Sequence, residues 1–225
     1  GYDGIILTGR ADHPVYLYIH DGRAELRDAA HLWGQTTHEA TDRLRGETDA
    51  KARVACIGPA GEKLVRFAAI MNDKDRAAGR SGVGAVMGSK NLKAVVVRGQ
   101  QRVELADPER FKAFNTRILD TFKAGVKETP LGLTVNGTAG VVITTQHLGV
   151  LPTKNWQQGT FDGWENIHGE QLTEKYLVSN KACYACPIGC GRKTRVEDST
   201  FAGEGEGPEY ETIYAMGANC MIDNL

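Results

Sequence analysis

The sequence has almost no net charge, because 27 lysines and arginines nearly balance 28 aspartates and glutamates to give −1 at pH 7. This argues against a nucleic-acid-binding protein, which needs a clearly basic face. No apolar run approaches the ~18–20 residues that a membrane-crossing helix requires. No basic-then-apolar leader is visible either. We therefore expect no nucleic-acid partner, no membrane span and a cytoplasmic location.

The two ends of the sequence lack the features of natural termini. The chain opens at Gly1 without a methionine and stops at Leu225, just after an apolar stretch. We therefore expect these 225 residues to be a central piece of a longer subunit. With 41% hydrophobic and 24% charged residues, the composition is that of an ordinary globular protein with a real core.

Cysteine is scarce and unevenly distributed. Three of the five cysteines fall within eight residues, and the full set is Cys56, Cys183, Cys186, Cys190 and Cys220. An odd, clustered count in a chain without an export signal argues for a metal or redox site over a disulfide framework. Cys56 and Cys220 lie in apolar stretches, so we expect both to be core residues.

The hydrophobic pattern predicts an α+β protein that divides near residue 103. Residues 1–103 are expected to be β-rich, with strands at Val15–Ile19, Ala24–Arg27, Ala52–Ile57, Val65–Met71 and Leu92–Val97 and a helix at Thr37–Arg45. A glycine-rich loop should separate the last two strands. This part is interpreted as the C-terminal portion of a β-rich domain.

Residues 104–225 are expected to begin a mostly α-helical domain. Asp107-Pro108 is a helix start, because aspartate caps the first turn and proline suits the first helical position. An apolar face follows at helical spacing, formed by Phe111, Phe114, Ile118 and Phe122. Two further helices are predicted at Gln171–Val178 and Tyr210–Met221.

The cysteine cluster has the spacing C-x2-C-x3-C, from Cys183 through Cys186 to Cys190. Pro187 and Gly189 would turn the chain so that the thiolates converge. A [4Fe–4S] cluster takes four thiolates, commonly three close together and one remote. Zinc with Cys220 as fourth ligand, or simple burial of the thiols, remain alternatives. No histidine completes a zinc pattern, since the nearest is His168.

The segment from Arg76 to Lys90 suggests an anion site. Its glycines allow backbone N–H groups to approach an oxyanion. Arg76 and Arg80 offer planar guanidinium groups suited to phosphate oxygens. The pattern matches neither a Walker loop nor a dinucleotide fingerprint. A glycine-rich turn with solvated arginines is the alternative that the residue types leave open.

Taken together, these segments resemble the aldehyde:ferredoxin oxidoreductase family of tungsten or molybdenum enzymes. The likeness runs in order along nearly the whole chain, through IGPAGE (57–62), RAAGR (76–80), GAVMGSKNLKA (84–94), CYACPIGCGR (183–192) and EGPEYE (206–211). In such enzymes a β-rich domain holds two pterins on one metal atom, and largely helical domains close over it. The family's fourth cluster cysteine and second pterin loop lie beyond this chain.

The resemblance implies roles for individual residues. Arg76, Ala77, Gly79 and Arg80 would contact a pterin diphosphate, and a backbone carbonyl near Ala77 would help to hold a bridging magnesium. The three clustered residues Cys183, Cys186 and Cys190 would bind a [4Fe–4S] cluster. Glu211 would lie beside the metal and accept a proton.

The implied reaction is oxidation of an aldehyde and water to a carboxylic acid at a tungsten or molybdenum bis-pterin. Electrons would pass through the cluster to ferredoxin or another carrier, in an anaerobic setting, and a homo-oligomer is compatible with this reading. Aryl-CoA reductases share the metal–pterin subunit and give a second enzymatic interpretation. A non-catalytic iron–sulfur or zinc module is the third.

Overall fold

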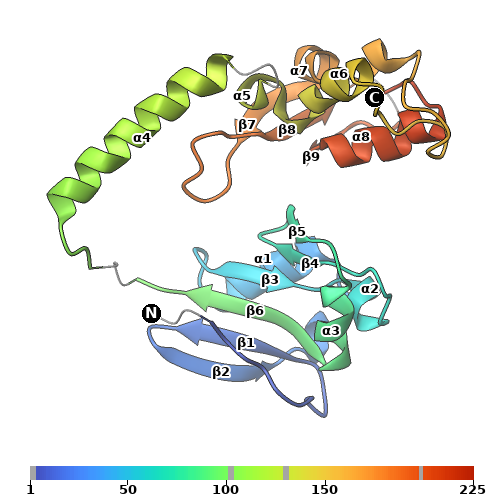
Figure 1. Cartoon of the computed structure of the whole chain (residues 1–225). Coiled ribbons are helices and arrows are strands. Elements are labelled where there is room, and N and C mark those ends of the chain that lie inside the picture. The colour runs from blue at the N-terminus through green and yellow to red at the C-terminus, as the bar shows by residue number, and fades with distance from the viewer. Residues whose placement is uncertain (1–3, 101–103, 129–131, 198–199) are drawn as a thin grey trace. The chain divides into compact units, whose positions relative to one another are not determined.

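The chain forms two compact units in the computed structural model, Gly1–Glu104 and Leu105–Leu225 (Figure 1). The structure describes residues 4–100, 104–128, 132–197 and 200–225. The boundary expected at residue 103 lies outside the described residues. Both units contain helices and strands, which confirms the predicted α+β class.

The first unit is built on one six-stranded sheet. Its spatial order is β2-β1-β6-β3-β4-β5, where β1 and β6 are parallel and the other pairs are antiparallel. The strands are β1 (Val15–His20), β2 (Arg23–Asp28), β3 (Arg53–Cys56), β4 (Ile70–Asn72), β5 (Arg76–Ala78) and β6 (Leu92–Arg98). The predicted hairpin β1–β2 turns at Asp21 and Gly22, both with positive φ.

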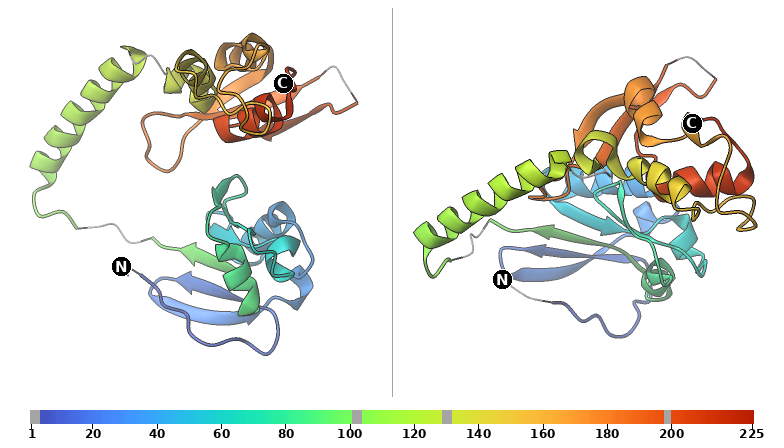
Figure 2. Two further views of the ribbon diagram at one scale, coloured as in Figure 1. Left: turned by 45° about the vertical axis from the view of Figure 1, so that its right-hand side comes forward. Right: turned by 45° about the horizontal axis from the view of Figure 1, so that its top comes forward.

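Helices cover both faces of this sheet (Figure 2). They are η1 (Ala30–Leu32), α1 (Thr37–Glu47), α2 (Pro59–Glu62) and α3 (Val83–Ser89). Because side chains alternate along a strand, Tyr16 and Tyr18 pack with Leu44 of α1. Leu17 points the other way and packs with Met87 of α3. The expected helix at Thr37–Arg45 is therefore confirmed.

The strand predicted at Val65–Met71 is wrong over most of its length. Only Ile70–Asn72 is a strand. The preceding residues form turns, because the Val65 N–H donates to Ala60 O at 2.9 Å and the Ala68 N–H donates to Val65 O at 2.9 Å. Ala68 is buried but Phe67 is 82% exposed, so the apolar character of this segment reflects neither strand pairing nor a continuous buried face.

The second unit packs helices around its own core. They are α4 (Pro108–Glu128), α5 (Leu133–Asn136), η2 (Gly137–Gly140), α6 (Val141–His147), η3 (Trp164–Asn166), α7 (Gly169–Tyr176), α8 (Tyr210–Met216) and η4 (Ala218–Cys220). The core includes Val142, Leu151, Leu172 and Ile213, all at most 4% exposed. Among the described residues no helix is long and apolar enough to cross a membrane.

The longest helix, α4, begins where the sequence predicted. The Arg110 N–H donates to Asp107 Oδ1 at 2.9 Å, which is the expected cap. The apolar face also forms, but its residues are between 36% and 51% exposed in the described part of the unit: Phe111, Phe114, Ile118 and Phe122. The face is thus not part of the unit's core.

The second unit is mostly helical, as expected, but it also contains a three-stranded antiparallel sheet that the sequence did not predict. This sheet consists of β7 (Leu177–Lys181), β8 (Gly191–Val196) and β9 (Gly203–Glu206). The helix predicted at Gln171–Val178 ends at Tyr176, where β7 begins. The helix predicted at Tyr210–Met221 ends at Met216, and the left-handed Met221 (φ 62°) stops the short turn that follows.

Candidate functional site

The four residues assigned to pterin binding lie together at the edge of the first unit's sheet. β5 carries Arg76 and Ala77, and it pairs with β4 alone at the end of the strand order. Ala77, Gly79 and Arg80 are exposed. A Cβ on Gly79 would meet only the Ala77 methyl, at 3.8 Å, so a ligand has room to approach the backbone there. This edge is open enough for an anionic group.

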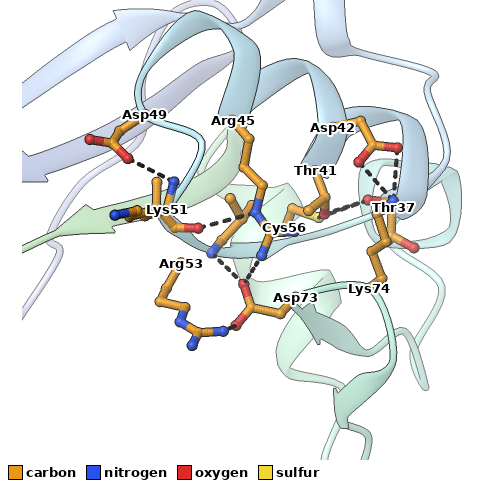
Figure 3. A network of polar contacts seen from close by, with 12 residues as sticks. Thr37, Thr41, Asp42, Arg45, Asp49, Lys51, Arg53, Cys56, Asp73 and Lys74 are labelled. Carbon is orange, nitrogen blue, oxygen red and sulfur yellow. Dashed lines mark hydrogen bonds and ion pairs between the residues drawn. The ribbon is translucent and has the colours of Figure 1, made fainter. Parts of the chain in front are cut away.

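Asp73 anchors the β4–β5 hairpin to the rest of the unit (Figure 3). Its Oδ1 accepts hydrogen bonds from Arg45 Nη2 at 2.7 Å and from the Val54 N–H at 3.1 Å. Its Oδ2 accepts from Arg53 Nη1 at 3.0 Å. These contacts tie the hairpin turn to α1 and β3, so they determine where the strand with Arg76 begins.

Replacing Asp73 with alanine should loosen the hairpin and lower the pterin content of the holoenzyme. The charge-assisted bonds lost are worth at least about 1.5 kcal/mol, and two arginines lose their shared partner. Thermal unfolding and acid-released pterin measure the two effects. Glu47→Ala is the matched control, because it removes a carboxylate that pairs with His31 and Arg43, away from the hairpin. Wild-type pterin content in the Asp73 variant would contradict this anchoring role.

The glycines that follow Arg80 serve packing. A Cβ on Gly88 would lie 2.0 Å from Gly61 O, and one on Gly84 would lie 2.5 Å from Ala69 O. The Gly84 N–H already donates to Ala68 O at 2.9 Å. These glycines let α3 lie directly against α2 and its following turn. The expected loop is thus a strand, a turn and a helix, and only residues 76–80 remain as candidates for binding an anion.

The three clustered cysteines lie on the loop between β7 and β8 in the second unit. All are free thiols, with Cys183 exposed and Cys186 and Cys190 partly exposed. The Cys186 N–H donates to Cys183 O at 3.0 Å, and Ala185 and Gly189 have positive φ. Among the described residues no three His, Cys, Asp or Glu side chains gather tightly enough to hold a metal ion. The donor set nevertheless fits three ligands of a [4Fe–4S] cluster, since three accessible thiols share one turning loop.

A buried arginine is linked to the cysteine loop through hydrogen bonds that pass by way of α5. Arg192 on β8 is 1% exposed, and its Nη2 donates to Leu133 O at 3.1 Å and to Thr134 O at 3.0 Å. Its Nη1 donates to Asn180 Oδ1. Thr134 Oγ1 in turn donates to Ile188 O, inside the cysteine loop, at 2.8 Å. Burial lowers the pKa of Arg192, while attraction to the Cys190 thiolate and the Glu209 carboxylate opposes that shift.

The two glutamates at the start of α8 have different surroundings. Glu209 Oε2 accepts a hydrogen bond from Thr138 Oγ1 at 2.6 Å, and Thr138 Oγ1 accepts one from the Tyr210 N–H at 2.9 Å. Glu209 therefore helps to fix the start of the helix. Glu211 lies in the first turn and is exposed. Its carboxylate is the one of the two that is accessible for chemistry.

The remaining cysteines differ from each other. Cys56 is fully buried, and burial raises the pKa of its thiol, so its role as a core residue is confirmed. Cys220 was also expected in the core, but it is exposed, and its Sγ donates to Ala215 O at 3.2 Å. The expectation failed because α8 ends before it and the following turn directs it outward.

Models of one family match almost all of the chain. The N-terminal domain of aldehyde ferredoxin oxidoreductase matches residues 1–99, and domains 2 and 3 of the same enzyme match residues 117–225. The chain belongs to the aldehyde ferredoxin oxidoreductase family. The sequence resemblance drawn from the cysteine and arginine motifs is thus confirmed.

Individual family members support the same conclusion. The chain is 50% identical over its full length to a tungsten-containing aldehyde ferredoxin oxidoreductase of Pyrococcus abyssi, and 47% identical to one of Thermococcus kodakarensis. It spans 37% of the length of each. An aliphatic sulfonate oxidoreductase subunit of Pyrococcus furiosus is 34% identical.

A solved structure has the same fold. The active-site complex BamBC of benzoyl coenzyme A reductase, with bound 1,5-dienoyl-CoA, matches with a TM-score of 0.70 and 27% identity. The match covers 96% of this chain and 36% of the other. The names of these similar proteins therefore mention at least three different substrates.

Proposed function

We propose that this chain forms part of an enzyme that converts an aldehyde and water to a carboxylic acid, two protons and two electrons. The observation that carries the proposal is the 50% identity to a tungsten-containing aldehyde ferredoxin oxidoreductase along the entire chain. The two clusters of candidate ligands, on the β5 edge and on the β7–β8 loop, would supply part of the ligands that such an enzyme needs.

Arg76 and Arg80 would bind the diphosphate of a pterin cofactor through charge-assisted hydrogen bonds. Gly79 leaves the backbone approachable, and the Ala77 carbonyl would help to hold magnesium between the phosphates. A tungsten or molybdenum bis-pterin, when bound there, supplies the two-electron redox chemistry. The residues of this chain would orient the cofactor, and the two arginines would offset its negative charge.

Cys183, Cys186 and Cys190 would supply three of the four thiolates of a [4Fe–4S] cluster. Such a cluster accepts electrons singly, so when bound it would supply one-electron transfer toward ferredoxin or another carrier, with these three thiols holding it. Glu211 would accept the proton that water loses as it attacks the aldehyde. Its exposure on the first turn of α8 leaves both oxygens available for that task.

Glu211→Gln in the holoenzyme should keep normal iron, tungsten and pterin but lose at least ~10²-fold in turnover, because the proton acceptor is gone. Steady-state oxidation of an aldehyde measures the loss. Glu209→Gln should cost less turnover and more thermal stability, because Glu209 joins the hydrogen bonds that start α8. Equal losses of turnover at both positions would make Glu211 a structural residue.

Metal analysis and an aldehyde assay of the holoenzyme test the proposal as a whole. We expect a brown, EPR-active protein that contains iron with tungsten or molybdenum and reduces a viologen dye when an aldehyde is added. Zinc as the sole metal would overturn the enzymatic assignment and favour a non-catalytic module.

A second reaction is favoured by the structural match to benzoyl coenzyme A reductase. The same cofactor ligands would then serve reduction of an aromatic ring on a CoA thioester. Supplying the holoenzyme with either an aldehyde or an aryl-CoA under matched redox conditions distinguishes the two. Turnover of the thioester alone would replace the aldehyde proposal.

A further inference from the structure

Arg192 is the largest fully buried side chain in the described residues, and it is positively charged. Removing a cation from water is costly unless an anion or several hydrogen bonds compensate it. Its three acceptors are all neutral: the carbonyls of Leu133 and Thr134, and the amide oxygen of Asn180. Hydrogen bonds therefore fix the guanidinium in place without neutralising its charge.

The other fully buried cation behaves differently. Lys93 Nζ lies 2.5 Å from Glu62 Oε1, and both side chains are almost completely buried. That charge is neutralised within the first unit. Arg192, by contrast, forms no ion pair with a carboxylate in the described part of the chain. Its Nε is also buried without a hydrogen-bond partner there. Two anionic groups attract it electrostatically, Cys190 and Glu209, and the attraction to one of them is larger.

The position of the guanidinium indicates which anion that is. A Cβ on Gly137 would lie 2.6 Å from Arg192 Nε and 2.8 Å from Cys190 O, so both atoms pack against the same spot. Gly137 has a positive φ of 61° and no side chain to separate them. The buried side chain thus packs close to the backbone of the last of the three clustered cysteines, whose thiolate would be negative when it binds metal.

We propose that Arg192 is a positioning residue whose fixed positive charge offsets the cysteine thiolates and raises the reduction potential of the cluster they hold. This inference rests on the proposed iron–sulfur site. Each reduction adds one electron to an already anionic cluster and forms no new bond. A buried cation nearby stabilises the more negative, reduced form more than the oxidised form.

The test is an EPR-monitored redox titration of the holoenzyme, with iron content measured in parallel. Arg192→Gln removes the charge and keeps a polar side chain, whereas Arg192→Lys keeps the charge. Asn180→Ala removes one of the three hydrogen bonds to the guanidinium and leaves the charge of Arg192 in place. Arg195→Gln is the matched control, because Arg195 lies on the same strand but is exposed and paired with Glu204.

We expect a more negative midpoint potential in Arg192→Gln and near wild-type potentials in the other three variants. An unchanged potential in the Gln variant, or an equal shift in the Lys variant, would overturn the inference.

If the Gln variant loses its iron, the Lys variant decides between the two roles of Arg192. Retained iron at the wild-type potential supports the role of the positive charge, and lost iron shows that only the hydrogen bonds matter. A wild-type enzyme without an iron–sulfur signal would instead refute the proposed cluster.

Discussion

Replacing Cys186 with alanine in the holoenzyme should abolish its iron–sulfur EPR signal and remove most of its iron. Cys186 is the central thiol of the three, and its N–H closes the turn onto Cys183 O. A [4Fe–4S] cluster uses four thiolates, so losing one leaves an iron atom without its protein ligand. Iron stoichiometry and low-temperature EPR of the purified variant measure the effect.

Cys220→Ala provides the control for this experiment. Cys220 is an exposed thiol in the same unit, on the short turn after α8 and outside the β7–β8 loop. Its replacement should leave iron and the EPR signal unchanged. Full iron in the Cys186 variant would show that the loop is not the cluster site, and loss of iron in the Cys220 variant would make Cys220 a ligand of the cluster.

Replacing Arg76 and Arg80 together with alanine should leave a folded protein that carries little pterin. Each charge-assisted hydrogen bond to phosphate contributes roughly 1.5–3 kcal/mol. If each arginine forms one, the pair is worth ~10²–10⁴-fold in cofactor affinity. Acid release of pterin from the purified variant, followed by fluorescence, measures what remains bound.

A double variant at Arg23 and Arg43 is a suitable comparison. Both arginines are exposed in the same unit but lie away from the β5 edge, Arg23 on β2 and Arg43 on α1. Their loss removes the same charge without touching residues 76–80, so pterin should be retained. If the Arg76/Arg80 variant also keeps wild-type pterin, the segment is only a turn with solvated arginines, as its residue types alone would allow.

Local patterns in the sequence predicted the elements that depend on near neighbours. The Asp21-Gly22 turn, the helix over Thr37–Arg45 and the cap at Asp107 all formed, because each is determined by residues within one or two turns of the chain. The strand over Leu92–Val97 also formed, since a continuous apolar run is typical of a central strand. The clustered cysteines and arginines identified the family for the same reason: their spacing is local.

The elements that the sequence missed depend on pairing between distant segments. β7 and β9 are mostly exposed and polar, with Gly-Glu-Gly-Glu forming all of β9. Neither shows the alternation that predicts a half-buried strand, and backbone hydrogen bonds to β8 decide their structure. The turns at residues 65–69 were mistaken for a strand because short apolar runs also occur in turns, here with Phe67 left 82% exposed.

The sequence by itself indicated the groups on which the proposed chemistry depends. They are three thiols spaced as C-x2-C-x3-C, two arginines four residues apart, and a glutamate pair after Gly207-Pro208. Tertiary structure alone decided which of these residues are accessible and what surrounds them. Glu211 became the exposed carboxylate and Glu209 the structural one only because Thr138, far away in the sequence, reaches Glu209. Arg192 became a buried, fixed charge because α5 and β7 supply its acceptors. Burial and charge compensation depend on contacts between distant residues, and no local pattern encodes them.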